Sequence, residues 1–308
     1  MGPDLPAGPE RPGSRGGVFD PGPVPSLTMA RSEFVLRPFE GLPGEPDWVA
    51  MREVVPAASA TARTTTAHGA KDVLVVTLLP GAWPAIHRAD GVILLALQQN
   101  AGSGDASRDL ADLLLRAMAL GPGTAIRSVT PPADDAADGP APRLQDVLDL
   151  TVPFTVTVHD AFDFWGLEGS DLEADAVATA DALDVVPTRR LGSVESGYWT
   201  RMGGREYVRW AQPHDEESFM DALARLHARR ESGLGDGGAQ GRFIGAFRSC
   251  GLVVPVWELE SGLAEDRIEE LMGALAGRLD GALAVDEPLD ANARRARAGL
   301  VARQLTLR

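Results

Sequence analysis

The chain has very few of the residues that support covalent, metal or phosphate chemistry. Its 308 residues include a single cysteine, Cys250, so neither an intrachain disulfide nor a cysteine-based zinc site can form. Lys71 is the only lysine, and it lacks the preceding glycines of a phosphate-binding loop. The motifs G-x-S-x-G and H-E-x-x-H are absent, which removes support for nucleophile-elbow hydrolases and zinc proteases. The near absence of cysteine predicts a reducing, cytoplasmic location.

Long apolar runs and an excess of positive charge are also missing. The longest apolar runs, at residues 73–79 and 92–97, are too short to cross a bilayer. A net charge of -15 produces a field that repels phosphates, so we expect neither a membrane nor a nucleic acid as a partner. With 44% hydrophobic residues, the composition predicts an acidic globular protein that buries a sizeable core.

Two segments have the composition of unstructured chain. Residues 1–32 are dense in proline and glycine and predict a disordered leader without signal-peptide character. Apolar content rises abruptly after Met29, so translation from Met1 and from Met29 both stay open. Residues 130–142 predict a linker. We therefore expect a first α+β repeat before this linker, at residues 33–129, and a second α+β half with C-terminal helices at 143–308.

The order of elements recurs on the two sides of the linker. The first series is a helix at 46–55, a strand at 73–79, a hairpin turning at Asp90–Gly91 and a helix capped by Asp105. The second is a helix at 143–150, a strand at 154–159, a hairpin turning at Gly203–Gly204 and a helix capped by Asp215. We therefore predict an α+β fold made by tandem duplication of a helix-strand-hairpin-helix unit, with mostly antiparallel sheets covered by helices.

A third series follows, opening on three apolar residues with helical spacing, Phe243, Ile244 and Phe247. This spacing predicts a helix that Gly251 ends and that a strand at 252–257 follows. Cys250 would then lie at the end of a helix, where the carbonyl groups raise the pKa of a thiol. We expect an inert cysteine.

The stretch "VHDAFDFW" at residues 158–165 is the strongest candidate for a catalytic site. Strand alternation places His159 opposite the apolar series, near the strand end, with Asp160 and Asp163 in the following loop. One interpretation is a metal-dependent hydrolase that uses these three side chains, as the HD phosphohydrolases use histidine and aspartate. The interpretation that we favour is structural: a strand end followed by three packed aromatic residues, Phe162, Phe164 and Trp165.

Tryptophans and the C-terminal arginines are the candidate binding residues. Most tryptophans lie in or beside predicted strands, where core packing is their usual role. The alternative is an exposed groove for a partner protein, lined by Trp83, Trp165 and Trp257. The last predicted helix carries Arg294, Arg295 and Arg297. They can pair with acidic helices of the same chain or form a docking surface for an acidic partner.

Six segments together resemble a known family: "RPFEGLPGEPDWVAMREVVPA", "SGDASRDLADLL", "VTVHDAFDFW", "EYVRWAQPHDE", "GLVVPVWEL" and the ending "RRARAGLVARQLTLR". They are similar to an uncharacterised family of high-GC Gram-positive bacteria, a domain of unknown function often labelled SecA-related or SEC-C motif protein. The resemblance covers residues 34–308. The zinc motif behind that label needs N-terminal cysteines, and this chain has none before Cys250. The segment around "GLVVPVWEL" is also similar to the SseB-like domain. The family implies no established activity.

From these observations we expect a cytoplasmic, non-enzymatic interaction or regulatory module, without a cofactor and with a protein as its partner. The oligomeric state stays open. The alternative, a hydrolase, requires His159 and its aspartates to converge with His87 or His214 in a pocket.

Overall fold

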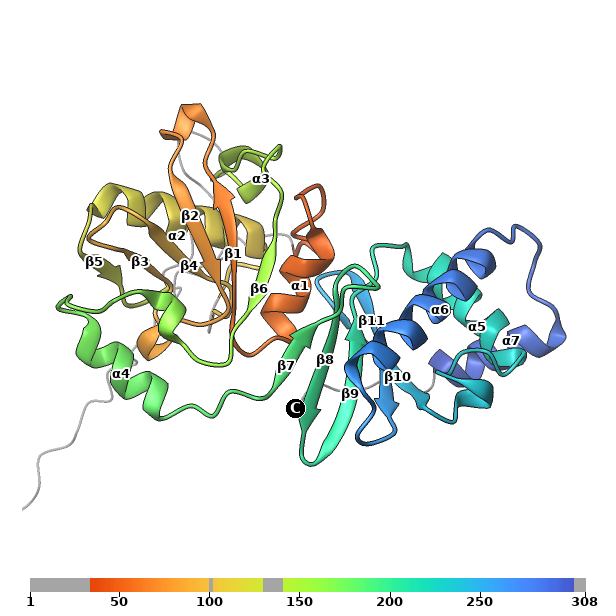
Figure 1. Cartoon of the computed structure of the whole chain (residues 1–308). Coiled ribbons are helices and arrows are strands. Elements are labelled where there is room, and N and C mark those ends of the chain that lie inside the picture. The colour runs from red at the N-terminus through yellow and green to blue at the C-terminus, as the bar shows by residue number, and fades with distance from the viewer. Residues whose placement is uncertain (1–33, 100–101, 130–140, 302–308) are drawn as a thin grey trace, which may run out of the picture. The chain divides into compact units, whose positions relative to one another are not determined.

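The computed structural model describes residues 34–99, 102–129 and 141–301 (Figure 1). These residues form the predicted α+β fold, with seven α-helices and two mostly antiparallel sheets. The helices are α1 (Glu45–Glu53), α2 (Ala106–Leu120), α3 (Leu144–Val147), α4 (Glu173–Asp181), α5 (Glu216–Ala228), α6 (Glu265–Leu283) and α7 (Ala291–Val301). No helix of the described ranges is both long and apolar enough to cross a membrane. The predicted leader and most of the predicted linker fall outside these ranges.

The first sheet has the strand order β5-β3-β4-β2-β1-β6. Its strands are β1 (Ala58–Arg63), β2 (Asp72–Val76), β3 (Ala85–His87), β4 (Ile93–Ala96), β5 (Thr124–Ile126) and β6 (Val156–Val158). Only β2 and β4 pair in parallel. Helices α1, α2 and α3 pack on one face, and α4 with the short turn at Asp163–Trp165 packs on the other. The sheet is therefore covered on both faces.

Helix α2 forms where the sequence predicts it. The carboxylate of Asp105 accepts hydrogen bonds from the backbone N–H groups of Ser107 and Arg108, which otherwise have no partner in the first turn. The predicted apolar stripe is buried; it consists of Leu110, Leu113, Leu114 and Ala117.

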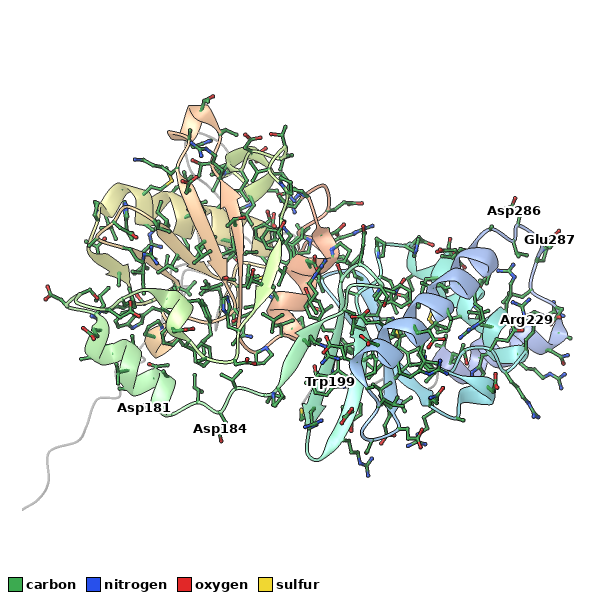
Figure 2. All side chains as sticks on the ribbon, viewed as in Figure 1. Asp181, Asp184, Trp199, Arg229, Asp286 and Glu287 are labelled. Atoms are coloured by element: carbon green, nitrogen blue, oxygen red, sulfur yellow. The ribbon has the colours of Figure 1, made fainter. Side chains whose placement is uncertain are left out.

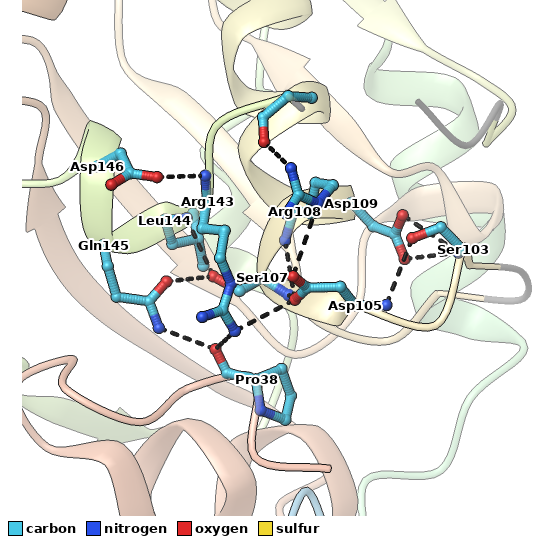
Figure 3. A network of polar contacts seen from close by, with 11 residues as sticks. Pro38, Ser103, Asp105, Ser107, Arg108, Asp109, Arg143, Leu144, Gln145 and Asp146 are labelled. Carbon is cyan, nitrogen blue, oxygen red and sulfur yellow. Dashed lines mark hydrogen bonds and ion pairs between the residues drawn. The ribbon is translucent and has the colours of Figure 1, made fainter. Parts of the chain in front are cut away.

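The cap of α2 also holds the chain that follows the predicted linker (Figure 3). Nε of Arg143 lies 2.9 Å from Oδ2 of Asp105, an ion pair whose N–H is not aligned for a hydrogen bond. The Oγ of Ser107 donates to the side chain of Gln145 and accepts the N–H of Leu144. This network fixes the start of α3 on α2.

The second sheet is wholly antiparallel, in the order β10-β11-β9-β8-β7. Its strands are β7 (Thr188–Arg190), β8 (Gly197–Met202), β9 (Arg205–Trp210), β10 (Gly241–Ser249) and β11 (Leu252–Leu259). The predicted hairpin turns at Gly203–Gly204, where both residues have positive φ. Helices α5, α6 and α7 pack against one face, which buries Trp199, Val208 and Trp257. The opposite face carries the cavity described below.

The helix predicted from Phe243, Ile244 and Phe247 is wrong, because this segment is strand β10. A β-bulge between Phe243 and Gly245 inserts one residue into the strand and changes the face on which later side chains lie. Phe243 therefore packs under the helices, whereas Phe247 packs on the opposite face. In a regular strand, side chains on one face are two residues apart. Because of the bulge, Ile244 and Phe247 share a face although they are three residues apart, which is a spacing typical of a helix.

The predicted positions of Cys250 and Gly251 at a helix end are wrong for the same reason. These residues form the two-residue turn between β10 and β11, and both have positive φ. The pKa of the Cys250 thiol is raised, as expected, but the cause is burial and not a helix end.

The strand predicted at 154–159 exists as β6, but it pairs with β1 in the first sheet. Segments on both sides of the predicted linker thus build one sheet. The predicted hairpin turning at Asp90–Gly91 joins β3 to β4, and the hairpin at Gly203–Gly204 lies in the second sheet. The duplication and the domain division at residues 130–142 stay predictions.

Candidate functional site

A cavity of about 580 Å³ lies against the face of the second sheet that α5, α6 and α7 leave uncovered. The second sheet contributes Thr200, Met202, Tyr207, Arg209, Ile244, Phe247 and Val256 to its wall. The rest of the wall is the end of α1 with the residues after it, Glu53, Val54, Val55 and Pro56, together with Gln98 and Val186. Cavities of this size accommodate small-molecule ligands.

Strand geometry explains why these side chains share one wall. Thr200 on β8 is the direct partner of Tyr207 on β9, so side chains two residues away from each lie on the same face. The bulge in β10 brings Ile244 and Phe247 to this face, although they are three residues apart. Without the bulge, alternation would turn one of the two toward the helices.

Arg209 is the charged residue that distinguishes the cavity. Burial lowers the pKa of its guanidinium, which nevertheless stays protonated because arginine titrates far above neutral pH. Within the described part of the chain, no hydrogen bond or ion pair engages this side chain. Its neighbours on the hairpin differ: Arg201 pairs with Glu206 at 3.0 Å, and Arg205 pairs with Glu258 at 3.1 Å. Among the residues that the structure describes, Arg209 is thus a partly buried cation without a counterion.

Thr200 adds a second unsatisfied group to the same wall. Its side chain is 1% exposed, and its Oγ1 has no hydrogen-bond partner among the residues described. Leaving such a buried hydroxyl unpaired costs roughly 1–3 kcal/mol. The hydroxyl oxygen itself is covered, so what the cavity offers a ligand is the cation of Arg209 within largely apolar walls.

His159, the catalytic residue of the alternative hydrolase interpretation, belongs to a different place in the fold. Its Nε2 lies 2.8 Å from Oγ of Ser59 on β1, and its ring stacks on Phe164 with centroids 4.3 Å apart. Burial lowers the pKa of His159, which favours the neutral imidazole. The serine-histidine pair has no carboxylate on the other ring nitrogen in the described structure, so the orienting group of a catalytic triad is missing.

The proposed hydrolase site is incomplete around His159 in the described residues. Asp160 and Asp163 are near enough to act against the lowering of the His159 pKa, but both residues are exposed. His87 lies on β3, where its Nδ1 is 3.0 Å from the carbonyl oxygen of Ala117. In the ranges that the structure covers, no group of three or more His, Cys, Asp or Glu residues is placed to hold a metal ion. The structural interpretation of this stretch agrees with the burial of its aromatic residues Phe162 and Trp165.

The three candidate tryptophans are all buried: Trp83 is 6% exposed, Trp165 2% and Trp257 1%. Nε1 of Trp165 donates to the carbonyl of Leu78, and Nε1 of Trp257 donates to that of Ser232. Trp199, on the hairpin of the second sheet (Figure 2), is also buried, and the guanidinium groups of Arg189 and Arg201 lie 5.0 and 5.3 Å from its ring centroid. Burial gives the candidate tryptophans a core role, and partner binding through them stays a prediction.

The candidate arginines of α7 make contacts within the chain. Arg297 forms an ion pair with Asp221 of α5 at 2.5 Å, which is the intramolecular pairing that the sequence allows. Arg295 donates to the side chain of Asn292, and Arg294 donates to the carbonyl of Leu289. A docking role for this helix stays a prediction.

Arg209 was not among the residues singled out from the sequence. One signal was present: it stands between Val208 and Trp210, in a strand whose alternate residues are buried. Val208 and Trp210 point to the covered face of the strand, so Arg209 points to the opposite face. A partly buried cation there is stable only with an acidic side chain or a bound anion beside it. The cavity itself could not be inferred, because its wall joins segments that are far apart in the sequence.

Comparison with known proteins gives one match. A family model described as a family of unknown function, DUF5926, matches residues 38–308. This confirms the predicted resemblance to a domain of unknown function, and it gives no support to the SecA-related, SEC-C or SseB-like labels. No curated protein and no solved structure matches the chain.

Proposed function

We propose that this chain, which belongs to the DUF5926 family of unknown function, is a cytoplasmic, non-enzymatic binding module, and that the cavity beside Arg209 is its binding site. The observation that carries this proposal is a cavity of about 580 Å³ whose one guanidinium has no counterion within the described residues. Binding would let the module act in an interaction or regulatory role, as the sequence predicts.

Energetics support a binding role for this site. A partly buried charge without a partner loses solvation and gains nothing in return, so it weakens the isolated protein. Residues that break the rules of stability in this way are concentrated at functional sites. Arg209 and Thr200 both have polar groups without a partner among the described residues, and both residues line the same cavity.

The groups lining the cavity favour binding over catalysis. Glu53 is the only carboxylate among the wall residues that the structure describes, and it pairs with its neighbour Arg52 at 3.3 Å. The same described residues include no histidine, serine or cysteine that could act with it as a nucleophile or general base. The remaining side chains offer apolar contact and hydrogen bonds, which is the composition of a typical ligand pocket.

The proposal is tested by screening a small-molecule library against the full chain by thermal shift. A ligand that binds the folded state raises the melting temperature in proportion to its occupancy. Val186 lines the cavity and is partly exposed, so Val186→Trp should fill the cavity without disrupting the core. Val177→Trp, at an exposed position of α4 outside this wall, is the matched control.

We expect compounds that stabilise the wild type and Val177→Trp equally and fail to stabilise Val186→Trp. Stabilisation that survives in Val186→Trp would place binding elsewhere and overturn the proposal. A library without any stabilising compound at millimolar concentrations would also overturn it.

A further inference from the structure

We infer that the cavity recognises the carboxylate group of a small, mainly apolar molecule, with Arg209 as the anion-binding residue. This inference rests on the proposed function, since it names the class of ligand for that same cavity.

The ion pairs of other arginines on this sheet indicate that Arg209 binds an anion from outside the protein. Arg201, Arg205 and Arg242 each form an ion pair with a glutamate of the same sheet. Arg209 shares strand β9 with Arg205 but finds no acidic partner in the described residues. A guanidinium presents its N–H groups in a planar fork that matches the two oxygens of a carboxylate. The counterion that the described residues do not supply would then come with the ligand.

The charges of the wall favour a carboxylate over a phosphate. Among the described residues that line the cavity, Arg209 is the only cationic side chain, and Glu53 contributes a negative charge to the same wall. A monoanion is balanced by one guanidinium, whereas a phosphate carries a charge near -2 and accepts more hydrogen bonds than this wall donates. The net charge of -15 on the chain adds repulsion against multiply charged anions.

The rest of the wall indicates an apolar body attached to the carboxylate. Val54, Val55 and Val186 lie on one part of the wall, and Ile244, Phe247 and Val256 come from the second sheet. An alkyl or aryl chain would contact these residues. Medium-chain fatty acids combine these features in the simplest form.

The experiment is isothermal titration of the full chain with octanoate and, as a neutral analogue of the same shape, octanamide. Hydrogen bonds to charged groups are worth roughly 1.5–3 kcal/mol, so octanoate should bind at least about tenfold more tightly than octanamide. Arg209→Gln should lose at least about tenfold in octanoate affinity and should no longer distinguish the acid from the amide.

Two further variants distinguish a change in octanoate affinity from a change in the stability of the fold. Arg205→Gln removes the same charge from the same strand, but its side chain does not line the cavity, so it should bind octanoate as the wild type does. Thr200→Val removes a covered hydroxyl that has no partner among the described residues, so it should keep its melting temperature and bind octanoate as the wild type does. Arg209→Gln should melt no lower than the wild type, because the guanidinium has no partner within the described ranges.

The outcomes distinguish this inference from the function on which it rests. Equal binding of octanoate and octanamide, with both lost in Val186→Trp, would overturn the carboxylate inference and leave the cavity as the binding site. Unchanged octanoate affinity in Arg209→Gln would have the same meaning. Absence of octanoate binding, or preferential binding of inorganic phosphate, would also overturn the inference, and library compounds lost in Val186→Trp would still support the proposed function.

Discussion

The phenol of Tyr198 on β8 donates a 2.7 Å hydrogen bond to Oδ1 of Asp47 on α1, and both residues are buried. Arg190 on β7 donates to the other carboxylate oxygen at 3.1 Å. Burial and the adjacent carboxylate raise the pKa of Tyr198, so the phenol remains a donor over the whole physiological pH range. The contact joins α1 to the second sheet, and both of these elements supply walls of the cavity.

Replacing Tyr198 by phenylalanine should lower the free energy of unfolding by about 2 kcal/mol, because a buried carboxylate loses one of its two donors. Urea denaturation measures this change. The matched control is Tyr207→Phe, at the only other tyrosine, whose hydroxyl makes no hydrogen bond within the described residues. Equal losses in the two variants would mean that the contact with Asp47 contributes nothing specific.

The N-terminal cap of α2 should contribute more to the free energy of unfolding than the N-terminal cap of α5. Asp105 is 3% exposed and combines two capping hydrogen bonds with the ion pair to Arg143 (Figure 3). Asp105→Ala should therefore cost about 3 kcal/mol, since it also leaves a partly buried guanidinium unpaired. Asp215→Ala removes a cap from an exposed position and should cost clearly less. Urea denaturation of both variants tests the order, and the reverse order would contradict the role given to Arg143.

The stretch "VHDAFDFW", which carries the alternative hydrolase interpretation, should behave as a structural element. Asp160 and Asp163 are exposed, so changing both to asparagine should alter stability by no more than about 1 kcal/mol. Trp165 is buried and its indole donates to Leu78, so Trp165→Ala should cost about 3–5 kcal/mol.

Melting curves with added zinc, manganese or magnesium complete that comparison. We expect no metal-dependent stabilisation of the wild type. Stabilisation by one of these metals that disappears in the double asparagine variant would restore the hydrolase interpretation.

His159 should make the stability of the protein depend on pH near neutrality. Burial lowers the pKa of the folded imidazole below its unfolded value of about 6.5, against the opposing effect of Asp160 and Asp163. As the pH falls through the unfolded pKa, the unfolded chain takes up the proton first, so stability is lost until the folded pKa is passed. His159→Gln should lose less stability than the wild type between pH 7.5 and 5.5, as measured by urea denaturation. Parallel losses in the two proteins would contradict the shift.

The sequence predicted those helices and turns that are determined by a few residues close together in the chain. Asp105 caps its helix as expected, and the turn at Gly203–Gly204 follows from a pair of residues that tolerate positive φ. Strand β1 was missed because "ASATAR" has little apolar character, although pairing on both sides buries it. Strand β10 was read as a helix because a bulge changed its period. Such features depend on partner strands that no local pattern contains.

The candidate site was less predictable than the fold. His159 and Trp165 attract attention by residue type, yet the structure uses them in packing and hydrogen bonds. Arg209 looks like an ordinary surface residue of a strand until the described structure shows that no acidic side chain pairs with it. An unpaired charge is a property of the assembled wall, so only the folded chain can display it.

The most direct test of the binding site is a crystal structure of the full chain with 8-bromooctanoate, in which anomalous scattering locates the bromine. The account predicts the carboxylate on the guanidinium of Arg209 and the bromine among the apolar residues of the wall, near Ile244 and Phe247. A bromine outside this cavity, or an empty cavity at a concentration that saturates binding in solution, would contradict it.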